Sequence, residues 1–250
     1  MSHGSTALRT LVVSLGLLAA ACTMFARAAP PSFGIDQSFE DAPHWRAPAA
    51  LWLTPEGDTL FVACSKSGGV SILDTAKSEL ITEIPLGKSL AAMAATPDGN
   101  TLAVVDAGAD ELLIVDRYAR EIRLRARVAV PTKPTSVVVD RDGRYCFVAS
   151  RWSRVVSRVD LAAGKVAGTV AVDFNPHQST LLPDGKTLVV ADAFSGMMAV
   201  IDTESDRVVR QVNIPGHNMR GMALSPTGKE LLITQMIVTE SAPTTRDNVF

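Results

Sequence analysis

Residues 182–209 read LPDGKTLVVADAFSGMMAVIDTESDRVV, and this stretch decides the fold. A Pro-Asp-Gly turn at 183–185 leads into an apolar strand over 187–192, and a short loop leads into a second strand over 197–202. A tight turn follows, and a further strand begins at Arg207. Glycine after aspartate supplies the positive φ that a tight turn between antiparallel strands requires. The stretch therefore predicts a series of short antiparallel strands.

The same pattern occurs four times along the chain and begins a fifth time. The turn glycines are 42, 44, 42 and 43 residues apart, and the aspartates that end the following strand are 42, 44 and 42 residues apart. A period of about 40–45 residues with four short strands each is typical of β-propeller blades. These structural turn residues are Gly57, Gly99, Gly143, Gly185 and Gly228, with Asp74, Asp116, Asp160 and Asp202. We expect each of these aspartates to accept hydrogen bonds from backbone amides of the turn that follows it.

We therefore predict an all-β fold, a β-propeller of four-stranded antiparallel blades, with about four complete blades and a partial fifth. One blade exposes both of its apolar faces, so it is stable only when neighbours cover it. A ring of roughly 4–8 blades must close to protect its strand edges. The sequence thus favours a fragment of a larger ring of roughly seven blades, and an atypical capped terminal blade is the alternative. The predicted blades cover residues 49–86, 87–130, 131–173, 174–215 and, in part, 216–235.

Residues 1–28 have the pattern of a bacterial signal peptide. Arg9 gives a positive start, residues 11–21 are apolar, and Ala26-Arg27-Ala28 supplies the small residues of a cleavage site. The apolar run is too short to span a bilayer, which needs about 20 residues. We expect an exported protein, periplasmic or secreted, without a transmembrane segment.

Three further features concern the ends of the chain. Residues 18–22 loosely resemble a lipobox, so a lipid anchor at Cys22 is the alternative to cleavage after residue 28. Residues 29–48 carry four prolines and no clear period, and we expect a linker there. Residues 236–250 break the repeat, and we expect an irregular segment.

The composition limits the partners that the protein could bind. Hydrophobic residues make up 47% of the chain and charged residues 20%, which is typical of an ordered protein. The net charge is -2 and basic runs are absent, which argues against nucleic acid as a partner. With 5% aromatic residues, stacking surfaces for single strands would also be sparse. We expect a protein or a small molecule as the partner.

The cysteines predict neither a disulfide nor a haem attachment. Cys64 ends its strand and Cys146 lies near the start of its own, so we expect two free, buried thiols even in an exported protein. The sequence contains no Cys-x-x-Cys-His motif, so nothing in it attaches a c-type haem covalently. No cofactor is evident, and haem would require a further domain beyond residue 250.

The second strands of the repeats, each after an x-Asp-Gly turn or its variant, resemble the YVTN family of β-propeller repeats. These motifs are LFVAC at 60–64, LAVVD at 102–106, LVVAD at 188–192 and LLITQ at 231–235. The sequences Leu73-Asp74-Thr75 and Ile201-Asp202-Thr203 match the third-strand ending of that family. The likeness covers about residues 51–235, although no repeat spells the four letters YVTN.

The YVTN family is similar in turn to cytochrome d1-type haem domains and to lactonase-like propellers. Its exported bacterial members sometimes carry a cytochrome c-like region after the propeller. The resemblance implies the architecture and a scaffold or binding role. No catalytic residue is carried over, because no haem-attachment motif and no recognisable lactonase site pattern occurs in this sequence.

One face of such a propeller collects the repeated turns, and the other collects loops that differ between repeats. Loops on a rigid scaffold usually carry the binding groups. The variable face gathers the ends of the second strands and the loops that precede the first strands. We expect this face to bind the ligand or partner through Asp106, Ser150, Arg151, Trp152, Arg154, His177, Asp192, Phe194, His217, Asn218, Arg220 and Gln235.

Several of these residues have a simpler interpretation. A Ser, Asp or Gln that ends a strand often caps its own loop. His177 and His217 lie in analogous loops and are weak candidates for metal or haem ligands, since no third ligand follows at a recognisable spacing. Trp152, between two arginines, is either a contact for a partner or a surface covered by guanidinium groups.

The sequence favours an exported β-propeller scaffold that binds a protein partner or small ligand on its variable-loop face and is non-catalytic by itself. One alternative is the propeller part of a periplasmic redox protein whose haem domain lies beyond residue 250. A lactonase-like hydrolase is a further alternative, for which Asp106 with Asp192 is the one pair that could serve as acid and base.

Overall fold

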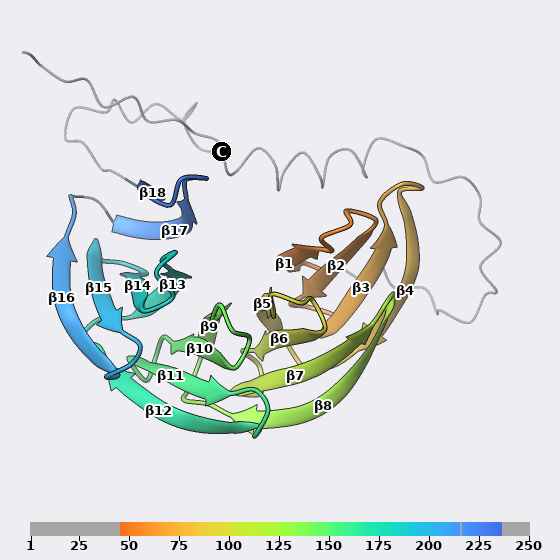
Figure 1. The fold of residues 1–250 in the computed structure, drawn as a ribbon, viewed down its shortest axis with the longest axis horizontal. Helices are drawn as coiled ribbons and strands as arrows, with labels where there is room; N and C mark the ends of the chain where they lie inside the picture. The colour runs from red at the N-terminus through yellow and green to blue at the C-terminus, as the bar shows by residue number, and fades with distance from the viewer. Residues whose placement is uncertain (1–45, 216, 237–250) are drawn as a thin grey trace, which may run out of the picture. The chain divides into compact units, whose positions relative to one another are not determined.

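The computed structural model describes residues 46–215 and 217–236, and its strands form five antiparallel sheets (Figure 1). We call these sheets blades 1 to 5 in chain order. In blades 1 to 4 the strands lie side by side in sequence order, and the described part of blade 5 has two strands. The predicted signal peptide, the linker before residue 46 and residues 237–250 lie outside the described residues.

Blade 1 contains β1 (Pro48–Leu53), β2 (Thr59–Cys64), β3 (Gly69–Asp74) and β4 (Glu79–Pro85). Blade 2 contains β5 (Leu90–Ala95), β6 (Thr101–Asp106), β7 (Glu111–Tyr118) and β8 (Glu121–Ala129). Blade 3 contains β9 (Pro134–Val139), β10 (Tyr145–Ser150), β11 (Val155–Asp160) and β12 (Lys165–Ala171). Blade 4 contains β13 (Pro176–Leu181), β14 (Thr187–Asp192), β15 (Met197–Asp202) and β16 (Arg207–Asn213), and blade 5 contains β17 (His217–Leu224) and β18 (Leu231–Met236).

The blades confirm the predicted all-β propeller architecture. The first strands β1, β5, β9, β13 and β17 contact one another in succession, and the fourth strands lie on the outside (Figure 1). The described residues include no helix long and apolar enough to cross a membrane. The predicted linker ends too late, because β1 already begins at Pro48. A proline fits there because the first residue of a strand can lack a ladder hydrogen bond.

The turn glycines have the conformation that the sequence predicts. Their φ values lie between 69° and 74°, where glycine has no steric penalty. In every repeat the glycine N–H donates to the carbonyl three residues earlier, at 2.8–3.2 Å. The same local turn therefore sets the register of the first and second strands in all five blades.

The aspartate at the end of the third strand behaves as predicted in three blades and differs in one. Asp74, Asp160 and Asp202 accept hydrogen bonds from backbone amides of the turn that follows, at 2.7–3.0 Å. Asp116 does not, because β7 continues past it to Tyr118. Its carboxylate instead forms an ion pair with Arg125 at 3.2 Å. The structural role predicted for Asp116 as a turn acceptor is therefore wrong.

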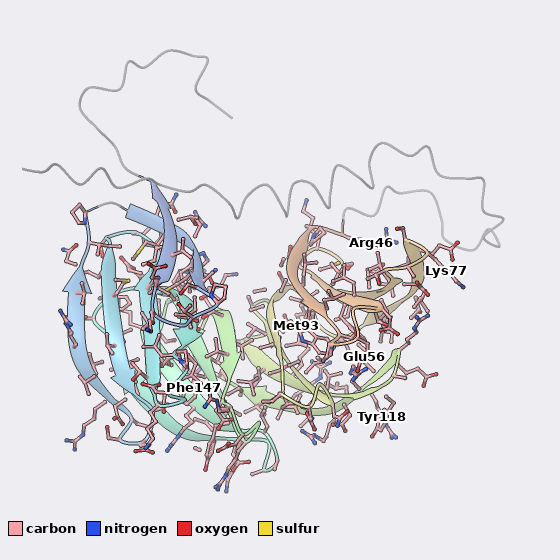
Figure 2. The ribbon with its side chains drawn as sticks, turned by 45° about the horizontal axis from the view of Figure 1, so that its top comes forward. Arg46, Glu56, Lys77, Met93, Tyr118 and Phe147 are labelled. Atoms are coloured by element: carbon pink, nitrogen blue, oxygen red, sulfur yellow. The ribbon has the colours of Figure 1, made fainter. Side chains whose placement is uncertain are left out.

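The core consists of layers between neighbouring blades, and each second strand contributes to two of them. In β6, Leu102 and Val104 pack in the layer with blade 1, whereas Ala103 and Val105 pack in the layer with blade 3. β10 and β14 divide their side chains in the same way. Met93 and Phe147 lie within these layers, and the exposed Tyr118 lies at the margin (Figure 2).

Both cysteines of the described residues are free and buried, as the sequence predicts. Burial raises the pKa of Cys146 well above its ordinary value, which keeps the thiol protonated. Burial also raises the pKa of Cys64. Neither thiol is a reactive nucleophile in this fold.

The turn glycines provide a test of the repeat. Gly57→Ala should destabilise the protein by about 1–2 kcal/mol, because its Cβ meets no atom within 4 Å and the cost is that of a positive φ. Gly143→Ala should cost more, because its Cβ would also lie 3.3 Å from Pro97 and Thr96 of blade 2. Urea denaturation of both variants measures the difference, with Gly57→Asn as the control that tolerates a positive φ. Equal losses for the two alanine variants would contradict the tight inter-blade contact.

Candidate functional site

The first strands carry a β-bulge where they meet the end of the second strands. In the complete blades, the register shift leaves one residue of the first strand without a direct partner. A bulge re-aims the side chain that it carries and often lies beside a functional site. In blade 5 the register shift covers the stretch between His217 and Gly221. The bulged residues are Ala49, Ala91, Thr135 and His177. These are 42–44 residues apart, and the equivalent position in blade 5, 43 residues after His177, is Arg220.

The bulge of blade 4 places His177 against the loop that follows β10 in blade 3. Nη2 of Arg151 lies 2.6 Å from Nδ1 of His177. A guanidinium group only donates hydrogen bonds, so Nδ1 accepts and the ring proton resides on Nε2. His177 is therefore a neutral imidazole whose Nε2–H is a free donor in the tautomer that this contact requires.

The surroundings keep His177 uncharged. Burial lowers its pKa from an ordinary value of 6.5 to about 4, with Arg151 and then Arg220 contributing in the same direction and Asp192 opposing them. Burial, followed by the nearby charge of Arg220, also lowers the pKa of Arg151. Two arginines from blades 3 and 5 thus act on one histidine of blade 4, and a single carboxylate partly offsets them.

Asp106 and Asp192 are fully buried at the ends of β6 and β14, where they hold loops in place. Each carboxylate accepts hydrogen bonds from backbone amides on both sides of its strand end. The donors are the amides of Lys88, Ser89 and Gly108 for Asp106, and those of Asn175 and Ser195 for Asp192. Both carboxylates therefore cap loops, and they come from blades 2 and 4. The arrangement offers no support for an acid–base pair.

Ser150 occupies the same position in blade 3, but its surroundings differ. The side chain is 0% exposed, and its Oγ has no hydrogen-bond partner. The amide of Lys133, in the loop before β9, donates instead to Oδ1 of Asp110 in blade 2, at 2.8 Å. Nε of the adjacent Arg151 is also buried and without a partner. Blade 3 thus has an unpaired hydroxyl where blades 2 and 4 have a satisfied carboxylate.

Trp152 is 67% exposed, and the cation over its ring is not an arginine. The ammonium group of Lys133 lies 5.6 Å from the ring centroid. The alternative in which guanidinium groups cover the ring is therefore wrong. Lys133 has a φ of 59°, and this left-handed backbone places it at the start of β9. Arg154, with a φ of 55°, ends the same loop and is exposed.

The remaining predicted residues occupy two blades. Phe194 is 56% exposed in the loop after β14. Nε of Arg220 donates to Oδ1 of Asn218 at 2.6 Å, within the first strand of blade 5. His217 begins β17 and Gln235 lies in β18. By the repeat period the blade 5 counterpart of His177 is Arg220, and His217 lies three residues before it, at the start of the same register shift.

A cation would be poorly placed at this site. Nδ1 of His177 already accepts from Arg151, and two arginines repel positive charge there. Among the described residues, no group of three or more His, Cys, Asp or Glu side chains is arranged to hold a metal ion. The geometry instead presents donors, namely the guanidinium group of Arg151 and the imidazole N–H of His177, with the charge of Arg220 acting on both.

A hollow of about 530 Å³ lies apart from this cluster, near the start of blade 2. Two of its charged groups pair with each other: Arg127 forms an ion pair with Glu111 at 2.9 Å and also donates to the carbonyl of Leu86 at 2.6 Å. Asp106, also in its lining, is used by the loop amides. Lys88 is the charged side chain of this lining for which the described residues supply no partner.

Sequence reasoning named the members of this cluster without the contacts that join them. The pairing of Arg151 with His177 depends on the bulge, and the role of Lys133 beside Trp152 depends on its positive φ. The sequence did contain a signal for this cluster. The residue at the bulge position is Ala, Ala and Thr in blades 1 to 3, and His and Arg in blades 4 and 5. Comparing that position between repeats would have selected His177 and Arg220.

The comparisons with known proteins define the class of fold. No protein-family model matches the sequence, so the resemblance to YVTN repeats stays a prediction. No curated protein matches it either. A solved structure of Kuenenia stuttgartiensis hydrazine synthase is similar, with a TM-score of 0.74 over 84% of this chain and 24% sequence identity. The chain spans 61% of the length of the chain that it matches, and the likeness supports the β-propeller fold alone.

The protonation of His177 provides a test of the cluster. In an NMR titration its imidazole should change charge near pH 4, and Arg220→Ala should raise this midpoint toward 6.5. Because the unfolded chain binds this proton near pH 6.5 and the folded chain near pH 4, the free energy of unfolding should fall as the pH drops through this window. An Arg144→Ala variant, changed at the opposite end of β10, should leave the midpoint unmoved. A wild-type midpoint at 6.5 would contradict the geometry.

Proposed function

We propose that this protein is an exported β-propeller scaffold that binds a protein partner or small ligand on the face where the second strands end. The observation that supports the proposal is the corner of blades 3 to 5. There, Nη2 of Arg151 contacts Nδ1 of His177, the charge of Arg220 lowers the pKa of both groups, and Trp152, the residue after Arg151, is exposed. Exposed aromatic residues and arginines are the side chains that most often dominate binding energy at interfaces.

A binding role is favoured over catalysis because the buried carboxylates are already engaged in hydrogen bonds with loop amides. Asp106 and Asp192, the pair that a hydrolase would need, are held by loop amides. The buried thiols of Cys64 and Cys146 are protonated and inaccessible. What the face offers is fixed donors and exposed rings on short loops between rigid strands. These features suit recognition.

Partner binding tests the proposal. Chemical cross-linking in a periplasmic extract, followed by capture of the tagged protein, should recover the partner with the wild type and with Arg144→Ala. The double variant Trp152→Ala with Arg154→Ala should weaken the binding of that partner at least about tenfold, as expected for loss of an exposed aromatic contact. Retention of full binding by the double variant would show that the blade 3 corner is not the contact.

Export is tested separately by the N-terminus of the mature protein. Cleavage after Ala28 predicts a mature chain that starts at Ala29, which intact-mass measurement or N-terminal sequencing would identify. A chain that starts at Cys22 and carries the added mass of acyl groups would identify the lipoprotein alternative. An uncleaved chain that begins at Met1 in the cell would contradict export by this signal.

A further inference from the structure

We propose that the face where the second strands end docks on a membrane surface that carries anionic phospholipids. This inference goes beyond the proposed function, because its partner is a lipid surface and not a dissolved protein or small ligand. It depends on three observations: the two ends of the blades differ in charge, the basic side chains at this face form no ion pairs among the described residues, and two exposed rings lie on its loops.

The two ends of the blades differ in charge. Because the blades are antiparallel, the loops that follow second and fourth strands lie at one end and the loops that follow first and third strands lie at the other. The loops at the first end contain five basic and two acidic side chains, and those at the opposite end contain six basic and nine acidic ones. The aspartates at strand ends preserve this contrast, since two end second strands here and four end third strands at the opposite face. Positive charge is therefore concentrated on one face of a chain whose net charge is -2.

The basic side chains of this face remain available to an anionic partner. They are Lys66, Lys88, Lys133, Arg151 and Arg154. Within the described part of the chain none of the five forms an ion pair, whereas Arg120, Arg144 and Lys186 of the opposite loops pair with carboxylates. Basic side chains close to an anionic bilayer are attracted by its surface potential. These five side chains therefore favour an anionic surface as the partner of this face.

Contacts between blades hold the loops of this face together. The amide of Lys133, before blade 3, donates to Oδ1 of Asp110 in blade 2 at 2.8 Å. Nη2 of Arg151 in blade 3 lies 2.6 Å from Nδ1 of His177 in blade 4. The loops of blades 2 to 4 thus belong to one surface on rigid strands, so their charges act together on whatever approaches it.

Two exposed rings occupy equivalent positions in neighbouring blades. The second residue of the loop between the second and third strands is exposed in blades 1 to 4, where it is Lys66, Gly108, Trp152 and Phe194. The two aromatic residues are 67% and 56% exposed. Every other large apolar side chain that is exposed in the described residues lies in a strand. The aromatic side chains of this face are therefore presented by loops, where they can meet a surface.

The pairing of rings with cations favours a lipid surface over an acidic protein. The ammonium group of Lys133 lies 5.6 Å from the ring centroid of Trp152, and Arg154 follows two residues later. Tryptophan rings favour the headgroup region of a bilayer, and lysine and arginine attract its anionic headgroups. In a protein interface such an anchor is buried in a fitted pocket of the partner. A bilayer surface accepts rings and cations side by side without such a pocket.

Vesicle binding by the purified protein, in the form that the cell processes, tests the proposal. In co-sedimentation at low ionic strength, vesicles of equimolar phosphatidylglycerol and phosphatidylcholine should bind the protein, and vesicles of phosphatidylcholine alone should bind it much more weakly. Added salt should release it, because salt screens exposed charges. Lys133→Gln and Arg154→Gln should each weaken binding about fivefold, the loss expected for one basic side chain near an anionic surface.

The rings have a matched control on the opposite face. Trp152→Ala combined with Phe194→Ala should weaken vesicle binding at least about tenfold, because both rings are lost from the interface. Tyr118→Ala should bind like the wild type, since Tyr118 is 63% exposed but ends β7 at the opposite face. Arg141→Gln, in an opposite loop, is the corresponding control for charge. All of these side chains are exposed or half-buried, and circular dichroism with thermal unfolding identifies the folded variants.

Two outcomes would overturn the proposal. One is the absence of binding to phosphatidylglycerol vesicles at low ionic strength. The other is equal binding by the wild type, the double ring variant and Arg154→Gln, which would place the lipid contact elsewhere in the chain. Capture of an acidic protein without vesicle binding would make this face a protein interface, so the inference would fail while the proposed function stood. Vesicle binding without capture of any dissolved partner would have the opposite meaning.

Discussion

The structure depends on covering both faces of each second strand. In β6, alternate side chains enter two different layers, so Leu102 and Val104 face one neighbouring blade while Ala103 and Val105 face the other. A strand shifted by one residue would exchange the two sets, and an alanine would then stand where leucine fills space. The positive-φ glycine turn before each second strand prevents that shift because it sets the local register. Where no described sheet covers a face, apolar side chains remain exposed, as Leu53 of β1 does at 50%.

This packing also determines where functional side chains can lie. In blades 1 to 4 the last residue of the second strand is buried, beside the loop that precedes the first strand. An aspartate there is satisfied by loop amides, as Asp106 and Asp192 are. The next residue lies at the surface of the face in blade 3, where it is Arg151 rather than alanine. A change of two adjacent residues at the end of one strand can therefore alter the charge of the face without altering the fold.

The fold was predictable because its causes are local and repeated. Gly185 and its equivalents indicate a turn with a positive φ, and the spacing between them indicates the size of a blade. Neither the turn nor the blade size has to be inferred from a contact between distant residues. The prediction for Asp116 is wrong for a local reason as well: β7 extends to Tyr118, and Ala119 adopts a φ of 54° in the turn that follows. The pattern around Asp116 does not show that the strand continues.

The site was predictable as a set of residues but not as a set of contacts. Arg151 and His177 are 26 positions apart, and their contact requires both the stacking of blades 3 and 4 and a bulge that turns His177 out of the regular ladder. The alternation of apolar residues predicts which side chains enter the layers between blades. It does not predict the bulge, because the bulged residue is alanine in two blades. The protonation state of His177 follows from that contact, since Nδ1 can accept from a guanidinium group only while the ring is neutral. The charge of the face is thus a property of neighbouring blades together, and no single repeat carries it.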